Sequence, residues 1–406
     1  MSEVAQAPHS SPDGHSPQLR FPEFSGNWEE VPFYDCLNDI LDFRGRTPLK
    51  IGMDWGGGNI ISLSANNVKN GYIDFNAECH LGSGELYEKW MGKVKLVKND
   101  IVFTMEAPLG KALLVPDDKR YILSQRVVAF KTKDYIDNLY FIQLIWSNKF
   151  QNTVDRLSTG STAKGINQKS LKKVFVNIPL KPEQQKIADF LTAVDNKIEL
   201  LRQKQELLGE YKKGLMQQIF SQAIRFKADD GIEFPDWEEK KLGGVGRIRK
   251  GSQLNKSELT DTGDYPAING GINPSGYTDK WNTGKNTITI SEGGNSCGYI
   301  NFITSKFWSG GHCYSIEELK GDVLNRFLFQ YLKFNEHLIM RLRVGSGLPN
   351  IQKGEINNFK VNLPSLEEQT KIANLLSSID SKIEQVGKQL RESKQFKKAL
   401  LQQMFV

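Results

Sequence analysis

The chain has 406 residues, of which 39% are hydrophobic and 25% are charged, and it carries a formal net charge of +6. This balance is typical of a soluble globular protein, and at about 100–200 residues per domain the length predicts two to four domains. No apolar run reaches the roughly 18 residues that a membrane helix needs, and four cysteines are too few for a disulfide framework. The mildly basic charge permits a polyanionic partner but does not show one.

The first eighteen residues are rich in Ser, Pro and His and contain no apolar core segment. We therefore predict a disordered tail over residues 1–18 rather than a secretory signal, and a cytoplasmic protein.

The rest of the chain contains an internal repeat. At a shift of 185 positions, residues 156–221 align with residues 341–406 without a gap, and 24 of the 66 positions are identical. A weaker repeat opens each half, where Phe-Pro-acid precedes Trp-Glu-Glu at residues 21–30 and 234–239. The blocks between, roughly residues 32–152 and 240–336, show little similarity to each other. The pattern indicates a duplicated scaffold that carries two different lobes.

Each repeated tail is predicted to form a long helix. Apolar residues recur at alternating spacings of four and three, as in a coiled coil, so we expect the two helices to pack against each other. About 39 residues would extend roughly 58 Å. Pro182 suits the first turn of the first helix, and Ser365 and Glu368 form a capping-box pattern at the start of the second. The expected interface residues are Ile187, Leu191, Val194, Ile198, Leu201 and Leu208 in the first helix and Ile372, Leu376, Ile379, Ile383, Val386 and Leu390 in the second.

Both blocks between the repeated segments are predicted to be α+β, because β-rich runs alternate in them with Gly- and Asn-rich turns. Strands are expected at residues 60–64, 100–104, 126–130, 287–290 and 299–303, and helices at residues 136–150 and 323–338.

Motifs for catalysis are missing. Residues 283–286 (Thr-Gly-Lys-Asn) lack the first glycine and the final hydroxyl of a Walker A loop. The acidic residues within 235–240 resemble a nuclease site only superficially, because they are too close in sequence to come from neighbouring strands. The Cys-His neighbours at residues 79–80 and 312–313 are the only hints of metal ligands, and we expect free thiols and no metal. The sequence therefore argues against a self-contained enzyme.

The chain resembles the DNA-specificity subunit of type I restriction–modification systems. The most specific features are the twin Val-Asn-[Ile/Leu]-Pro…Glu-Gln-x-Lys-Ile-Ala segments, which start at Val176 and Val361, and their twin Lys-Lys-x-Leu-x-Gln-Gln-x-Phe endings. Residues 19–24 (Leu-Arg-Phe-Pro-Glu-Phe) and 265–271 (Tyr-Pro-Ala-Ile-Asn-Gly-Gly) support the match, which covers nearly all of the chain after Leu19.

The resemblance implies two target-recognition domains, at residues 19–174 and 228–358. A central helical spacer at 175–227 and a C-terminal helix at 359–406 would join them as an antiparallel pair with a pseudo-two-fold internal repeat. Each domain would read one half of a bipartite, asymmetric DNA target, and the helices would set the unread gap.

The resemblance also implies partners. The helices would bind modification subunits, two per copy, which hold S-adenosylmethionine and methylate adenine. A restriction subunit that uses ATP and Mg²⁺ would complete the complex, and this chain itself would hold no cofactor.

DNA contacts are expected from Lys and Arg to phosphates and from polar loop residues to base edges. In the first block the candidates are Arg44, Arg46, Thr47, Lys50, Asn66, Asn67, Lys69, Ser161, Thr162 and Lys164. In the second they are Lys250, Ser252, Gln253, Asn255, Lys256, Asn269, Asn273, Asn295, Ser296, Ser346 and Asn350. Trp28 and Trp237 are expected to pack within their domains rather than stack on bases.

Two alternatives from other classes remain open at this point. A stand-alone two-lobed DNA-binding protein would bind DNA tightly with no partner. A coiled-coil interaction scaffold would bind DNA only weakly, without specificity, and would lose it with salt.

Overall fold

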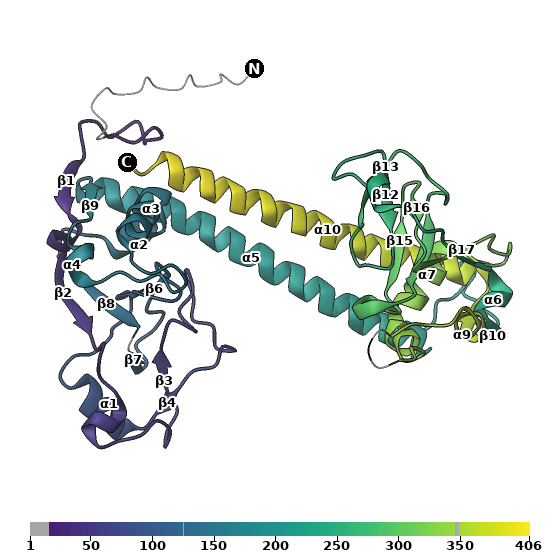
Figure 1. The fold of residues 1–406 in the computed structure, drawn as a ribbon, viewed down its shortest axis with the longest axis horizontal. Helices are drawn as coiled ribbons and strands as arrows, with labels where there is room; N and C mark the ends of the chain where they lie inside the picture. Colours follow the sequence, from purple (N-terminus) through teal and green to yellow (C-terminus); the bar gives the residue numbers. More distant parts are fainter. Residues whose placement is uncertain (1–15, 125, 346, 348) are drawn as a thin grey trace. The chain divides into compact units, whose positions relative to one another are not determined.

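The structure is a computed structural model that describes residues 16–124, 126–345, 347 and 349–406 (Figure 1). It divides into two compact units, one formed by the chain up to Arg202 together with Lys388–Val406 and the other by Gln203–Gly387. Residues 1–15 of the predicted disordered tail lie outside the described residues.

The first unit contains short strands and helices that lead into one long helix. Its strands are β1 (Glu29–Pro32), β2 (Leu37–Asp42), β3 (Ile60–Leu63), β4 (Leu81–Gly82), β5 (Ile101–Thr104), β6 (Ala112–Leu114), β7 (Tyr121–Leu123), β8 (Val127–Thr132) and β9 (Phe175–Ile178). Its helices are η1 (Phe33–Cys36), η2 (Pro48–Ile51), α1 (Gly84–Met91), α2 (Asn138–Trp146), α3 (Asn148–Leu157), α4 (Gln168–Leu171) and the first part of α5 (Lys181–Phe220).

The second unit contains a corresponding set of strands and helices. Its strands are β10 (Glu238–Lys241), β11 (Arg247–Lys250), β12 (Tyr265–Ile268), β13 (Gly276–Thr278), β14 (Thr287–Ser291), β15 (Ile300–Ile303), β16 (Trp308–Ser309), β17 (Cys313–Glu317) and β18 (Lys360–Leu363). Its helices are α6 (Leu242–Val245), η3 (Lys256–Glu258), η4 (Gly294–Ser296), α7 (Asn325–Phe334), α8 (Glu336–Met340), α9 (Lys353–Asn358) and the first part of α10 (Leu366–Gln403).

A short antiparallel strand pair closes a lobe in each unit. β1 pairs with β9, with Glu29 opposite Ile178, and β10 pairs with β18, with Glu238 opposite Leu363. The Trp-Glu-Glu and Val-Asn-[Ile/Leu]-Pro motifs are therefore hydrogen-bonded partners, which accounts for their joint repetition. We call residues 33–174 the first lobe and residues 242–359 the second lobe.

The two lobes have the same topology although their sequences show little similarity. The first contains a four-stranded sheet in the order β2-β8-β5-β6 and a three-stranded sheet in the order β4-β3-β7. The second repeats both, as β11-β17-β14-β15 and β13-β12-β16. In each small sheet one pair is parallel, namely β3 with β7 and β12 with β16. The predicted α+β class and internal repeat are thus confirmed.

All five predicted strands are present, within one or two residues of the expected bounds. The predicted helices at 136–150 and 323–338 were wrong in one respect, because each is divided in two. The first divides at Ser147, whose hydroxyl accepts a hydrogen bond from the amide of Phe150 at 3.3 Å and so caps α3.

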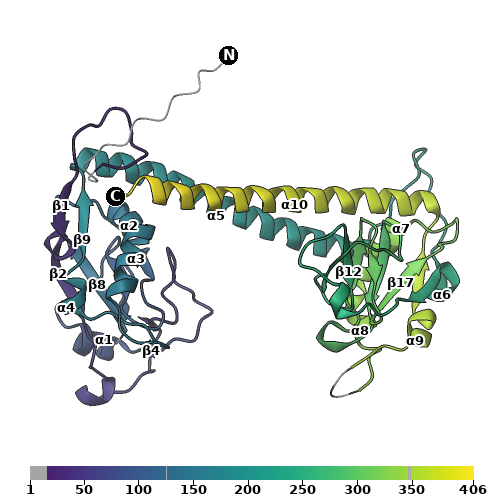
Figure 2. The same cartoon turned by 45° about the horizontal axis from the view of Figure 1, so that its top comes forward.

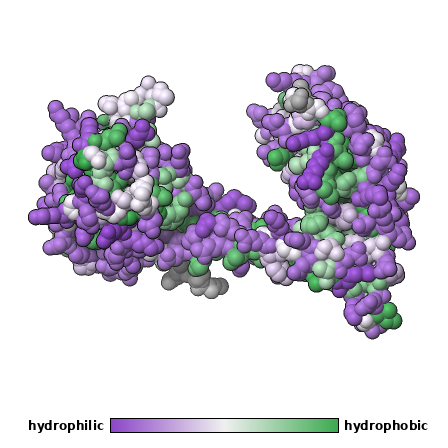
Figure 3. All heavy atoms as spheres, turned by 90° about the horizontal axis from the view of Figure 1, so that it is seen from below, coloured by the Kyte–Doolittle hydropathy of each residue, from purple (hydrophilic) through white to green (hydrophobic). Residues whose placement is uncertain are grey.

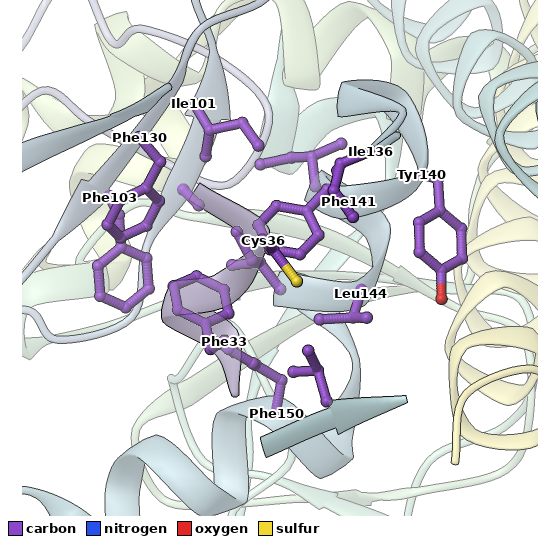
Figure 4. Packing of buried hydrophobic residues seen from close by; sticks show 14 of the residues in the cluster. Phe33, Cys36, Ile101, Phe103, Phe130, Ile136, Tyr140, Phe141, Leu144 and Phe150 are labelled. Carbon is purple, nitrogen blue, oxygen red and sulfur yellow. The ribbon is translucent and has the colours of Figure 1, made fainter. Parts of the chain in front are cut away.

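Alternating side chains of the first lobe's four-stranded sheet enter two cores. Phe103 of β5 and Phe130 of β8 pack with Phe33, Phe141 and Phe150 on the side of α2 and α3 (Figure 4). The intervening residues of both strands point to the opposite face, toward α1 and the small sheet. Both faces are buried, which explains the uninterrupted apolar runs.

The second lobe uses only one face of its large sheet for an extended apolar core. Ile288 and Ile290 of β14 pack toward α7, whereas Thr287, Thr289 and Ser291 face the other way and are also buried. A small cluster on that other face includes Ile268 and Phe307. The alternation matches the sequence pattern Thr-Ile-Thr-Ile.

The two predicted long helices are present as α5 with 40 residues and α10 with 38 (Figure 2). Ser365 caps α10 by accepting a hydrogen bond from the amide of Glu368 at 3.3 Å. The Glu368 carboxylate binds Arg225 and Trp237, so no reciprocal capping-box bond is made by its side chain. No helix among the described residues is long and apolar enough to cross a membrane.

The ends of the predicted helix interface lie in the lobe cores. Ile187 and Leu191 pack with residues of the first lobe and with Leu400, Met404 and Phe405 of the C-terminal segment. In the second unit Ile372 and Leu376 likewise pack with lobe residues and with the end of α5. Within each unit the two helix segments therefore run antiparallel. The remaining interface residues stay a prediction of the heptad pattern: Val194, Ile198, Leu201, Leu208, Ile379, Ile383, Val386 and Leu390.

Candidate DNA-recognition edge and helix anchors

In both lobes one edge of the four-stranded sheet collects loops. At this edge β2 and β5 end where β8 begins, with Asp42 opposite Val128 and Thr104 opposite Val127. In the second lobe β11 and β14 end where β17 begins, with Lys250 opposite Tyr314. We call this the loop edge of each lobe.

Two further segments join each loop edge. The end of β3 is joined to the first loop edge, because the amide of Ser124, the residue after β7, donates to the Leu63 carbonyl at 2.9 Å. In the second lobe the amide of Gly310 makes the equivalent bond to the Ile268 carbonyl at 2.8 Å. The repeated Gly-Ser loops are attached by bridges from Gly165 to Glu106 and from Asn350 to Gly293. All the described residues predicted for DNA contact therefore lie at the end of a strand that reaches a loop edge, follow such a strand, or belong to a loop bonded to that edge.

Arg44 lies just after β2 and is held by Asp42, whose carboxylate accepts from the Arg44 Nε at 2.9 Å and from Gln168 at 2.6 Å. Burial alone would raise the pKa of Asp42, but these bonds hold it below its ordinary value. The carboxylate thus fixes the direction of the guanidinium at the loop edge.

The other three candidates in this loop differ in the contacts that their side chains make. The Arg46 guanidinium lies 4.9 Å from the ring centre of Phe43, and Lys50 donates to the Gly45 carbonyl at 2.6 Å. Thr47 precedes η2, and its side chain makes no capping bond there. Lys50 is exposed, so its ammonium can exchange the carbonyl for a phosphate.

In the loop after β3, the prediction that Asn67 contacts DNA was wrong. Asn67 is only 1% exposed, and its amide accepts from the backbone of Ser64 at 2.7 Å and donates to the Ser62 carbonyl at 2.9 Å. Asparagine is favoured in turns because its side chain makes such local bonds, and here they remove it from the surface. Asn66 is exposed, and Lys69 is half-buried.

Ser161, Thr162 and Lys164 are exposed on the Gly-Ser loop of the first lobe. The Lys164 ammonium pairs with Asp155 at 2.6 Å. Exposed ion pairs contribute about 0–1 kcal/mol, so a phosphate can replace this partner at little cost.

The segment after β11 presents polar side chains at the second loop edge. Ser252, Gln253, Asn255 and Lys256 are exposed. Lys250 is different, because its ammonium already pairs with Glu292.

The loop after β12 depends on a glycine. Gly270 has φ +82°, and a Cβ there would lie 2.6 Å from the His312 carbonyl oxygen, so no other residue fits without a shift. Asn269 is half-buried, and its side-chain oxygen accepts from the His312 amide at 3.2 Å. Asn273 is exposed.

The turn after β14 completes the second loop edge. Asn295 is exposed, whereas Ser296 is half-buried and donates to the Gly270 carbonyl. Asn350 is exposed and is bridged to Gly293. Ser346 lies outside the described residues.

Sequence reasoning missed a network around Glu292, whose side chain is 11% exposed. The carboxylate accepts from the Tyr314 hydroxyl at 3.0 Å, pairs with Lys250, and lies 3.2 Å from the Nδ1 of His312. Burial would raise the pKa of Glu292, but Lys250, Tyr314 and His312 together hold it below its ordinary value. Each partner is 20 or more positions from Glu292 along the chain, so no local spacing could have identified the network.

The first lobe contains an ion pair that was also not predicted from the sequence. Arg126 lies just before β8, and its Nε is 3.8 Å from a carboxylate oxygen of Glu106, which follows β5. The Arg126 side chain is 57% exposed and that of Glu106 is 50% exposed.

A buried carboxylate at the start of each long helix anchors the chain that precedes β1 or β10. Glu183, 3% exposed, accepts from Arg20 at 2.7 and 2.8 Å and from the Trp28 indole at 3.2 Å. The equivalent set in the second unit is Glu368, Arg225 and Trp237. Both tryptophans therefore pack within their units, as predicted.

Each long helix carries an exposed aromatic side chain at an equivalent repeat position. Tyr211 and Phe396 are separated by the repeat shift of 185 and are both more than half exposed. Figure 3 shows that the surface seen from below is largely hydrophilic, with apolar residues in separate groups. An exposed aromatic repeated in both units is a candidate contact for a protein partner.

Among the described residues no group of three or more His, Cys, Asp or Glu side chains is placed to hold a metal ion, and the four cysteines are free thiols. Cys36, Cys297 and Cys313 are buried, and burial raises the pKa of Cys36 to about 12. The His80 ring stacks on the Trp55 ring, with the ring centroids 4.9 Å apart.

Comparison with known proteins gives consistent matches along the chain. A family model described as the type I restriction modification DNA specificity domain matches residues 27–210 and 235–392. A putative type I restriction enzyme MjaX specificity subunit from Methanocaldococcus jannaschii is 27% identical, with 93% of each chain covered.

Solved structures show the same fold. The S subunit of a type I restriction-modification system from M. genitalium aligns with a TM-score of 0.66 at 20% identity, covering 96% of this chain and 99% of the other. A chain from a study of complex assembly in a type I R-M system aligns with a TM-score of 0.54 at 17% identity, covering 92% and 96%.

Proposed function

The chain belongs to the type I restriction modification DNA specificity family, and from this premise we propose that its two lobes each read one half of a bipartite DNA target. Proteins of this family are the specificity subunits of type I restriction enzymes rather than the catalytic ones. The lobes would therefore supply sequence recognition to a complex whose chemistry lies in other subunits.

One observation carries the proposal: the same strand framework presents different polar residues at the same loop edge in each lobe. The backbone order is conserved between the lobes, whereas Arg44 and Arg46 follow β2 and Ser252 and Gln253 follow β11. Two copies of one frame with unlike reading residues suit a target with two unlike half-sites.

The chemistry of the loop edges suits double-stranded DNA. Exposed lysines such as Lys50 and Lys256 can neutralise phosphates, and amides such as Asn66 and Asn273 can make paired hydrogen bonds to adenine. Apolar side chains are not needed for this kind of surface.

The proposed partners are modification subunits that hold S-adenosylmethionine, and a restriction subunit that uses ATP and Mg²⁺. Tyr211 and Phe396 support binding of two modification subunits, because each unit offers one exposed aromatic at the same repeat position. Tyr211→Ser with Phe396→Ser should abolish co-purification of the modification subunit, whereas the exposed Leu366→Ser should leave it unchanged.

Adenine methylation across a genome tests the proposal directly. The modification subunit would be expressed with and without this chain, and methylated adenines would be mapped by single-molecule sequencing. We expect a split motif only when the chain is present. Absence of any new motif, with the modification subunit shown to be active, would contradict the proposal and favour a stand-alone DNA-binding protein.

A further inference from the structure

One side chain in each lobe occupies the same position at the loop edge. Arg126 and His312 are the residues immediately before β8 and β17. The carbonyl of Arg126 accepts from the amide of Met105 at 2.9 Å, and that of His312 accepts from the amide of Glu292 at 2.9 Å. The two positions are therefore structurally equivalent although the sequences around them do not align.

Each of these side chains is exposed and is paired with a carboxylate from the end of the neighbouring strand. Arg126 is 57% exposed, with its Nε 3.8 Å from Glu106. His312 is 65% exposed, with its Nδ1 3.2 Å from Glu292. Each lobe thus has a side chain with hydrogen-bonding groups at the point where its loops meet, and the His312 ring is directed by its 3.2 Å contact with Glu292.

We propose that Arg126 and His312 are equivalent base-reading residues, one for each half of the DNA target, and that Glu106 and Glu292 are their positioning residues. The proposal rests on the proposed function of the lobes. The Arg126 fork matches the O6 and N7 acceptors of guanine. In the neutral form of the His312 ring that donates its Nδ1 proton to Glu292, Nε2 is the acceptor on the exposed side and suits the amino group of adenine or cytosine.

Backbone hydrogen bonds already connect the loops around these pairs. The first loop edge is held by backbone bonds, from Ala107 to Lys164 at 3.3 Å and from Ile166 to Met105 at 2.8 Å. The corresponding bond in the second lobe runs from the amide of Ile351 to the Glu292 carbonyl at 2.9 Å. In the Arg126–Glu106 pair both side chains are at least half exposed, so the pair adds at most about 1 kcal/mol to this framework and a purely stabilising role does not account for its presence.

The network also changes the role expected for Lys250. Its ammonium pairs with Glu292, and its Nζ lies 6.0 Å from the ring centre of Tyr314. We assign it to the support of Glu292, and through Glu292 of His312, rather than to a direct contact with DNA.

The test uses the complex with the modification subunit, the methylation map, and binding to duplexes that carry single base-pair changes. His312→Ala should leave the first half-site unchanged and relax one base pair of the second, with discrimination there falling by about ten- to a hundredfold. Arg126→Ala should do the reverse. Arg126→Lys keeps the charge but loses the fork, and should relax the same base pair as Arg126→Ala.

The chain offers matched control residues away from the loop edges. Arg120 is exposed and lies 3.7 Å from Glu88, at the opposite end of β7. Arg247 pairs with Glu318 at 3.0 Å, at the opposite edge of the second sheet. Arg120→Ala and Arg247→Ala should leave the motif unchanged.

The positioning role has its own readout. Glu292→Ala should relax the same base pair as His312→Ala, the double variant should add nothing, and Glu292→Gln should recover part of the discrimination because an amide oxygen can still accept from Nδ1. If His312→Ala and Arg126→Ala both retain the full wild-type motif, the inference is wrong while the proposed function stands. If the wild-type chain directs no split motif, the proposed function fails and this inference fails with it.

Discussion

Asp195 of α5 and Lys397 of α10 form an ion pair at 2.6 Å inside the first unit. Gln143 of α2 donates to the same carboxylate at 2.9 Å, and the Lys397 ammonium lies 4.4 Å from the ring centre of Trp146. One polar junction therefore connects a lobe helix to both long helices.

The second unit repeats this junction at positions related by the repeat. Lys212 of α5 pairs with Asp380 of α10 at 2.7 Å, and Gln330 of α7 donates to Asp380 at 2.8 Å. The helices exchange roles, since the lysine now comes from α5 and the aspartate from α10. A partly buried polar contact of this kind favours one docking register over others.

We predict that Lys397→Met loosens the first unit. Burial lowers the pKa of Lys397 and the Asp195 charge opposes that effect, so the ammonium depends on its partner. Asp195 is a third exposed, and its loss of a partner should therefore cost about 1–3 kcal/mol rather than the larger penalty of a fully buried charge. Hydrogen exchange of α2 and of residues 181–202 would measure the change.

Lys388→Met is the control for that experiment. Lys388 also lies on α10, but it is exposed and is 3.9 Å from Glu392. Faster exchange in this variant as well would show that any lysine on the helix has the effect, and would contradict a specific junction.

We predict that Arg20→Ala destabilises the first unit more than the double variant Arg20→Ala with Glu183→Gln. The single change leaves a buried carboxylate without its guanidinium, which costs about 3–5 kcal/mol. The double change removes the charge, and the amide oxygen can still accept from Trp28. Unfolding in urea, followed by hydrogen exchange of β1, would rank the variants. Equal losses would indicate that the charge of Glu183 is unimportant.

We predict that two equivalent phenylalanines stabilise different units. Phe405 packs against Trp28 and Tyr140 in the first unit, and Phe220 packs against Phe327 and Tyr331 in the second. Alanine at either position should cost about 3 kcal/mol, the low end for a buried phenylalanine because the surroundings can relax.

The location of the effect distinguishes this prediction from general damage. Phe405→Ala should speed hydrogen exchange in α2, and Phe220→Ala in α7. Phe396→Ala, at an exposed position of α10, should affect neither. Loss of protection in both units from either single variant would contradict the assignment.

We predict an acid-sensitive contribution from Glu292. Its pKa is lowered in the folded protein, so the folded state binds its proton less readily than the unfolded state does. The resulting stabilisation is complete above the ordinary glutamate pKa, about 4.3, and is lost as the pH falls through the lower folded value. Each unit of lowering contributes about 1.4 kcal/mol.

The comparison of wild type with Glu292→Gln isolates this contribution. The free energy of unfolding of the second unit should converge for the two proteins as the pH falls below about 4.3, and should differ by a constant amount at higher pH. Lys250→Met should shrink the difference, because it removes the cation beside the carboxylate. Parallel curves from pH 3 to 6 would contradict the prediction.

Local patterns predicted the framework well. Strand β5 follows from a short apolar run and β14 from an alternation of Thr and Ile, and α5 and α10 follow from heptads that persist for more than five turns. The division at Ser147 was missed although the residue is a good helix cap, because the apolar pattern continues across it.

The loop edges were predicted in composition but not in detail. Polar residues after strands are correctly placed near one edge, yet Asn67 is buried and Lys250 is paired with Glu292. The equivalence of Arg126 and His312 could not be read from an alignment, because it rests on backbone bonds within two sheets of different sequence.

The sequence by itself determined the repeat, the two long helices and the family, because each depends on residue order along one segment. Tertiary structure alone decided that the two unlike blocks have one topology, since a strand requires only side chains that suit the two faces of its sheet, and many sequences satisfy that. It also decided which polar side chains face outward at each loop edge, because a charged group takes its partner from whatever the fold brings within a few ångströms, regardless of separation along the chain.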